Sequence, residues 1–187
     1  TDTWVRVLDG YLKTTKHDHA LMALYRLAED VGALQDARQY TDMTQALIIA
    51  GFGQEAERVM QKGIDASLFA GDEATRAKRT IDAAKRKADA ERAALPKAAN
   101  ALAAAKTGDE MEKVGELYFS AGDYVNASAA LQKAVAKGGL SDADSAQMLL
   151  GIALKRKGDK ANATKAFDLV KEPQFAEIAK LWKIAAR

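Results

Sequence analysis

Residues 115–134 read GELYFSAGDYVNASAALQKA, and residues 151–170 read GIALKRKGDKANATKAFDLV. The two stretches start 36 residues apart, and both carry the dipeptide Gly-Asp at the same position, which begins at Gly122 in one and at Gly158 in the other. A fixed spacing of this length is typical of proteins built from repeated pairs of helices. A glycine that ends one helix in the left-handed conformation, followed by an aspartate that caps the next helix, predicts a tight helical hairpin in each copy.

Other positions recur in the same order around these turns. They are Gly115, Tyr118, Ala127, Leu131 and Ala134 in one copy and Gly151, Leu154, Ala163, Phe167 and Val170 in the other. The same register continues toward the N-terminus through Tyr40, Met43, Leu47, Gly51, Ala56 and Met60, and before them through Trp4, Val7, Leu8, Tyr11, Ala20, Leu24 and Leu27. The small members predict close crossing of the two helices of a pair, and the large apolar members are expected to fill the space between pairs.

This pattern of bulky, small and aromatic positions resembles the tetratricopeptide repeat family, in degenerate form, and covers residues 1–70 and 108–175. Sel1-like repeats, a related family of helix pairs, have a similar period and are the second choice, because the short Gly-Asp turns favour the tetratricopeptide pattern. The resemblance implies an all-α fold, an α-solenoid of antiparallel helix pairs that form a tetratricopeptide-like superhelix with a capping helix at the C-terminus.

The register divides the chain into four parts. Two helix pairs are expected in residues 1–70, and two more in residues 108–172. Residues 71–107 are expected to form a degenerate pair, with a long, charged and largely exposed helix over 73–94 and a second helix after Pro96. Residues 173–187 follow a helix-breaking proline, and their apolar stripe predicts the capping helix. The stripe consists of Phe175, Ile178, Leu181, Trp182 and Ile184.

Composition excludes several classes of function. The chain has 28 basic and 26 acidic side chains. The resulting net charge of +2 is too small to indicate binding to nucleic acid or to an anionic membrane. No apolar run approaches the roughly 20 residues needed to cross a bilayer, which predicts a soluble chain without a membrane span. The absence of cysteine excludes disulfides and thiolate chemistry.

Residue types that carry catalysis or bind metals are present, but their patterns favour structural roles. His17 and His19 flank Asp18 in the turn of the first expected hairpin, where polar residues are common, and the chain has no other histidine to complete a metal site. Glu112 and Glu116 lie along one expected helix, an arrangement typical of solvated side chains and of ion pairs within a helix. The sequence therefore predicts no enzyme activity, no cofactor and no metal.

The resemblance to tetratricopeptide repeats implies that the first helix of each pair lines a concave surface that holds a protein or peptide. The residues expected to contact this ligand are Gln45, Ile48, Glu112, Glu116, Phe119, Met148, Ile152, Lys155 and Arg156, and the same face carries Asp9, Leu12, Lys13, Arg38 and Thr41. Exposed apolar groups with charged neighbours would form a peptide groove. The alternative is that the capping helix or a missing N-terminal repeat covers some of them.

The specialised members of the family that grip a terminal carboxylate place Lys and Asn on successive first helices. The matching positions here hold Val5, Asp9, Thr41 and Gln45, so this binding mode is not expected.

The sequence thus predicts a non-catalytic scaffold or adaptor that binds a protein or peptide. Three alternatives stay open: an accessory helical domain of a larger enzyme or complex, nucleic-acid binding through the basic helix 73–94, and self-association into a homodimer. Because the chain begins at Thr1, we expect it to be a piece of something longer. Removal of an export signal would place it in a bacterial periplasm, and otherwise the cytoplasm is expected.

Overall fold

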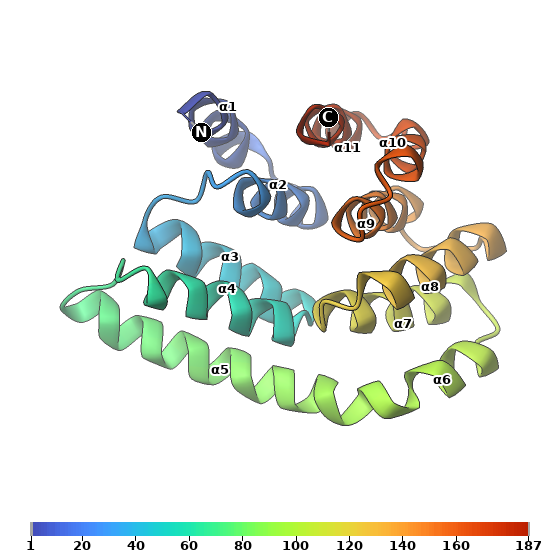
Figure 1. The fold of residues 1–187 in the computed structure, drawn as a ribbon, viewed down its shortest axis with the longest axis horizontal. Coiled ribbons are helices and arrows are strands. Elements are labelled where there is room, and N and C mark those ends of the chain that lie inside the picture. Colours follow the sequence, from blue (N-terminus) through green and yellow to red (C-terminus); the bar gives the residue numbers. More distant parts are fainter. Residues whose placement is uncertain (1, 187) are drawn as a thin grey trace.

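The structure is a computed structural model that describes residues 2–186, and every regular element in this range is a helix. The helices are α1 (Asp2–Thr14), α2 (Asp18–Asp30), α3 (Ala37–Ala50), α4 (Gly53–Asp65), α5 (Asp72–Ala94), α6 (Ala98–Ala104), α7 (Gly108–Ser120), α8 (Tyr124–Lys137), α9 (Ala143–Arg156), α10 (Lys160–Asp168) and α11 (Pro173–Ala185), with the short 3-10 turn η1 (Leu95–Lys97) before α6. Hairpins join α1 to α2, α3 to α4, α7 to α8 and α9 to α10 (Figure 1). None of the described helices combines the length and the apolar character that a bilayer crossing would require.

The hairpin turns have the conformation that the sequence predicts. Gly122 has a φ of 81°, in the left-handed region, and the side chain of Asp123 accepts a hydrogen bond from the backbone N–H of Asn126 at 3.0 Å. In the next copy Gly158 has a φ of 92°, and Asp159 caps its helix in the same way. The prediction that each turn consists of a left-handed glycine followed by a capping aspartate is confirmed.

Small residues allow the helices of a pair to approach closely. A Cβ atom added at Gly115 would lie 2.7 Å from Cγ of Leu131, and one added at Gly151 would overlap the ring of Phe167. The glycine and its large neighbour belong to the two helices of one hairpin in both cases, α7 with α8 and α9 with α10. The absence of a side chain at the repeated glycine therefore leaves the space that the repeated large residue, sixteen positions later, occupies.

Replacing Gly151 with alanine is expected to lower the free energy of unfolding by about 1–3 kcal/mol, because the new methyl group overpacks the α9–α10 crossing against Phe167. Urea denaturation measures the change. Gly10→Ala is the matched control, since a Cβ atom there meets nothing within 4 Å and alanine favours helix α1 by up to about 1 kcal/mol. Equal stability of the two variants would contradict this account of the crossing.

The long helix α5 packs along α4 with a narrow apolar face. Its buried residues are Ala77, Ile81, Ala84 and Ala88. A Cβ atom on Gly53 of α4 would lie 2.5 Å from the backbone nitrogen of Ala88, so these two helices also touch through small residues. The remaining surface of α5 carries the exposed basic residues Arg76, Lys78, Arg79, Lys85, Arg86 and Lys87. The prediction of a long, largely exposed helix is confirmed.

The expected helix pair in residues 71–107 does not form a hairpin. After α5 the chain passes through η1 and continues into α6, so that α5 and α6 follow one another end to end (Figure 1). The predicted antiparallel pair is wrong because no Gly-Asp turn lies between α5 and α6: Leu95 and Ala98 keep right-handed helical angles, and Pro96 lies in a first turn, where its missing N–H costs little. Helix α6 packs instead against α7.

A carboxylate of α5 fastens three helices together at this bend. Glu91 accepts the backbone N–H groups of Gly53 and Gln54, at 2.7 and 2.9 Å, and so caps the N-terminus of α4 from outside. The hydroxyl of Ser120, the last residue of α7, donates to the same carboxylate at 2.7 Å. A negative charge at a helix N-terminus is favourable, and here it also joins α4 and α5 to α7.

The chain curves until its two ends meet. Helix α2 contacts both α9 and α11, and the two termini lie at the same side of the molecule (Figure 1). The indole Nε1 of Trp182 on α11 donates to the backbone carbonyl of Ala23 on α2 at 3.1 Å. Phe175, Ile178 and Trp182 are fully buried, as the stripe predicts.

Two members of the stripe on α11 differ from the prediction. Leu181 is half-buried and Ile184 is exposed, because α11 is buried on one side by α9 and α10 and on another by α2, while these two residues lie at the margin.

Candidate functional site

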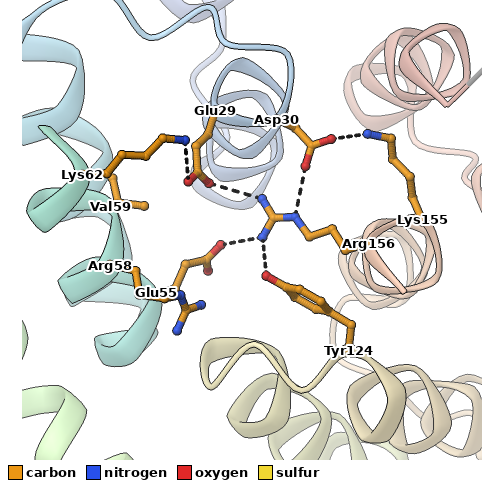
Figure 2. Close-up of a pocket in the computed structure, with 9 residues that line it drawn as sticks. All are labelled: Glu29, Asp30, Glu55, Arg58, Val59, Lys62, Tyr124, Lys155 and Arg156. Atoms are coloured by element: carbon orange, nitrogen blue, oxygen red, sulfur yellow. Dashed lines mark hydrogen bonds and ion pairs between the residues drawn. The ribbon is translucent and has the colours of Figure 1, made fainter. Parts of the chain in front are cut away.

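A polar cleft of about 450 Å³ lies where the C-terminal ends of α2 and α9 face α4 and the start of α8 (Figure 2). Its lining residues are Glu29, Asp30, Glu55, Arg58, Val59, Lys62, Tyr124, Lys155 and Arg156. Eight of these nine side chains are polar, and they come from helices that are up to about 127 residues apart in sequence. We refer to this feature as the charged cleft.

The local structure explains why charges gather there. Glu29 and Asp30 end α2, where the helix dipole is unfavourable for negative charge and no basic residue of the same turn compensates them. Lys155 and Arg156 end α9, where positive charge is favourable. The two helix ends face one another, so that the cations of α9 neutralise the carboxylates of α2. Tyr124 begins α8 directly after a Gly-Asp turn, which directs its ring toward the same space.

Arg156 is the hub of the charged cleft. Its Nε lies 3.3 Å from Asp30, its Nη1 lies 3.1 Å from the hydroxyl of Tyr124 and 3.4 Å from Glu55, and its Nη2 lies 3.4 Å from Glu29. Burial by itself would lower the pKa of this guanidinium, but Glu55, Tyr124, Glu29 and Asp30 raise it further above its usual value. Arg156 is therefore permanently charged and is held from four directions.

A buried ion pair forms the floor beneath this hub. Nη2 of Arg26 lies 2.7 Å from Oε2 of Glu55, and Nε of Arg26 lies 3.0 Å from Oε1. The two residues are 3% and 2% exposed. The Arg26 guanidinium also lies over the rings of Phe52 and Phe119, at 4.3 and 4.7 Å from their centroids. Burial would raise the pKa of Glu55, but the charge and hydrogen bonds of Arg26, helped by Arg156, hold that pKa below its usual value.

A second charged group lies near the N-terminal ends of α2, α7 and α9. Nδ1 of His19 is 3.1 Å from a carboxylate oxygen of Asp142, which also caps α9. Burial, with the nearby charges of Glu116, Asp109 and Asp142, raises the pKa of Glu112 to about 7. Burial also raises the pKa of Glu116, although Arg26 and His19 oppose this shift. These carboxylates lie outside the lining of the charged cleft.

Glu112 should make stability depend on pH. Its pKa is about 7 in the folded chain against a usual value of 4.5, so the folded chain binds the proton more tightly and the free energy of unfolding falls as the pH rises through this interval. Because Glu112 is partly solvated, we expect Glu112→Gln to stabilise the chain by only about 1 kcal/mol at about pH 8 and to change little at about pH 5. Thermal melts at both pH values test this. Glu73→Gln, an exposed residue in the first turn of α5, is the control and should show no such difference. A Glu112→Gln variant with the same pH profile as the wild type would refute it.

The expected binding residues do not form one surface. Lys155 and Arg156 line the charged cleft, whereas Gln45 lies with Arg38 and Thr41 in a separate groove of about 350 Å³ between α3 and α5. Ile48, Glu112 and Glu116 are partly buried. Phe119, Met148 and Ile152 are 0%, 2% and 0% exposed, so the expectation that they line an open groove is wrong.

The physical reason is the closure of the chain. Met22 and Ala23 of α2 and Phe175 of α11 pack over Met148 and Ile152, and the residual space between them is about 30 Å³. The alternative in which the capping helix covers apolar positions of the first helices therefore holds, with α2 as a second cover. The large apolar residues Phe119, Met148 and Ile152, which the repeat register assigns to a ligand-binding face, are here part of the core.

No protein-family profile, curated protein or solved structure is significantly similar to this chain.

The two histidines that the sequence places in the first hairpin turn pack and pair within the protein. His17 precedes α2, and its ring packs edge-on against Phe175 with centroids 5.1 Å apart, while His19 interacts with Asp142. Among residues 2–186 no cluster of three or more histidine or acidic side chains has the arrangement of a metal site.

Most residues of the charged cleft lie outside the positions that the sequence pattern predicts. Glu29, Asp30, Glu55, Arg58, Lys62 and Tyr124 lie on the second helices of their pairs, which the resemblance assigns to the outer side. One signal was present. Residues 20–28 read ALMALYRLA, apolar on nearly every side of a helix, which is typical of a helix surrounded by protein, and a charged residue such as Arg26 within it requires a buried partner.

Proposed function

We propose that this chain is a non-catalytic protein-binding module, a closed array of tetratricopeptide-like helix pairs that holds a segment of its partner in the charged cleft. The observation that supports this proposal is the cleft itself. Side chains from α2, α4, α8 and α9 converge on one open space of about 450 Å³, within the usual size range of ligand-binding pockets.

The chemistry of the cleft favours binding over catalysis. A general base needs a carboxylate whose pKa is raised toward neutrality within reach of a substrate. Glu55 has a lowered pKa, and Glu29 and Asp30 form ion pairs with cations of the opposite wall. The carboxyl groups with raised pKa values, Glu112 and Glu116, line no part of this cleft. Its charged groups are therefore arranged to hold one another and a ligand.

The groove between α3 and α5 is a secondary contact surface in this proposal. It is lined by Arg38, Thr41, Gln45, Glu73 and Arg76 together with the ring of Phe69. Its mixed charges suit the flank of a partner segment whose main anchor lies elsewhere, and a polar rim around a more buried anchor is the usual anatomy of protein interfaces.

Selection from a random-peptide display library tests the proposal. Binders with dissociation constants below about 100 µM are expected. Hydrogen exchange of the complex should then show protection in α4, at the start of α8 and at the end of α9. Failure to recover any binder, or protection confined to helices that do not line the cleft, would refute the proposal.

A further inference from the structure

The charged cleft contains more positive than negative charge. Its lining includes four cations and three carboxylates, and one of these carboxylates, Glu55, is already paired with the buried Arg26. Because the buried Arg26 neutralises Glu55 from beneath, the four lining cations face only Glu29 and Asp30, which leaves an excess of two positive charges. An excess of charge in a partly enclosed space attracts ligands of the opposite sign.

The cations of the cleft whose charge or N–H groups are least satisfied by the protein lie on α4. Arg58 donates through Nη1 to the backbone carbonyl of Ser120 at 2.7 Å, and its other N–H groups have no acceptor among the described residues. Lys62 lies 3.5 Å from Glu29, and its side chain is 55% exposed, so this ion pair is weak. Arg58 and Lys62 are four residues apart and therefore share one face of the helix.

A neutral donor completes the set. The hydroxyl of Tyr124 accepts a hydrogen bond from Arg156, and its own proton has no acceptor within residues 2–186. Arg58, Lys62 and Tyr124 thus present spare donors to one space (Figure 2). A ligand that fits them must supply acceptors and negative charge, which carboxylates do.

We propose that the charged cleft binds a pair of carboxylates through Arg58 and Lys62, with Tyr124 as an additional donor. This inference rests on the proposed function, in which the carboxylates belong to neighbouring acidic side chains of the partner segment. A free dicarboxylate has the same chemistry, and the experiment separates the two sources. The site lies on α4 and α8, the second helices of their pairs, and not on the first-helix positions of Thr41 and Gln45.

The same lining disfavours more highly charged ligands. Glu29, Asp30 and Glu55 stay in the cleft and repel any negative charge beyond the two that the cations can balance. A run of nucleic-acid phosphates needs an extended basic surface, whereas here the carboxylates of α2 border the donors of α4. Two singly charged carboxylates match the excess.

The experiment measures fluorescence anisotropy of a labelled Gly-Ser peptide with two consecutive glutamates at its centre, and of the same peptide with two glutamines in their place. At about 50 mM salt the glutamate peptide should bind at least about tenfold more tightly, and this difference should shrink at about 500 mM salt. The double variant Arg58→Gln, Lys62→Gln should weaken binding of the glutamate peptide by about tenfold or more and leave the glutamine peptide unaffected.

The matched control is Lys133→Gln with Lys137→Gln, which removes the same charge from exposed positions of α8 outside the cleft lining. This control should bind the glutamate peptide like the wild type. Equal affinity for the two peptides, or equal loss in the two double variants, would overturn the inference.

Competition with succinate, acetate and inorganic phosphate identifies the source of the carboxylates. If succinate displaces the glutamate peptide and itself loses affinity in the Arg58→Gln, Lys62→Gln variant, the site takes a free dicarboxylate; if succinate is inert while the peptide binds, it takes side chains of the partner. Both results support a carboxylate site, and tighter binding of phosphate than of succinate overturns it.

The two proposals fail in different ways. Library peptides that occupy the cleft but bind the Arg58→Gln, Lys62→Gln variant as tightly as the wild type would support the protein-binding function and contradict the carboxylate inference. Absence of any library binder would remove the protein-binding function itself.

Discussion

Replacing Glu55 with alanine should lower the free energy of unfolding by about 3–5 kcal/mol, because it leaves the buried guanidinium of Arg26 without a counter-ion. Arg26 is 3% exposed and is enclosed by the rings of Phe52 and Phe119, so water cannot replace the lost carboxylate. Arg156 loses an acceptor as well. The same substitution should loosen the floor of the charged cleft.

Urea denaturation measures this loss, and two further variants decide its origin. Asp9→Ala breaks an ion pair with Lys13 whose side chains are well exposed, and should cost no more than about 0.5 kcal/mol. The double variant Arg26→Met, Glu55→Leu removes both buried charges and should recover most of the stability that Glu55→Ala loses, since apolar residues can replace a buried ion pair. A Glu55→Ala variant as stable as Asp9→Ala would show that the pair is not buried as described.

Replacing Trp182 with alanine should cost a similar amount, about 3–5 kcal/mol, because its ring fills the space between the two ends of the chain. The indole stacks on Phe167 of α10 with centroids 6.0 Å apart, and the ammonium of Lys155 on α9 lies 5.2 Å from its centroid. Its Nε1 donates to Ala23 of α2. The substitution therefore empties a site that touches three other helices.

Hydrogen exchange distinguishes loss of closure from a general loss of stability. In Trp182→Ala, amide protection should fall in α1 and α2 as well as in α11, while α7 and α8 keep theirs under native conditions. Trp182→Phe is the control, since it keeps most of the apolar area and loses only the hydrogen bond to Ala23, at a cost of about 1–3 kcal/mol. Protection lost in α11 alone would contradict the closure of the chain through this residue.

The sequence determined the local units of this protein. Each Gly-Asp turn specifies its hairpin through backbone conformation and a cap within a few residues, and Gly115 and Gly151 specify the helix crossings by being small opposite Leu131 and Phe167. These interactions are short in range and repeat at a fixed spacing, so they can be read from the sequence. The position of Lys155 and Arg156 in the last turn of α9 could be anticipated on the same basis.

The tertiary structure alone decided how the units are arranged and where the charged cleft lies. Helices α5 and α6 continue end to end where the sequence suggests a hairpin, and this sets the path by which α9 and α11 return to α2. The return buries Met148 and Ile152 and brings Asp30 to Lys155. Such contacts join residues far apart in sequence. They depend on the packing angles between all the intervening helix pairs taken together, and no local sequence pattern specifies the combined effect of these angles.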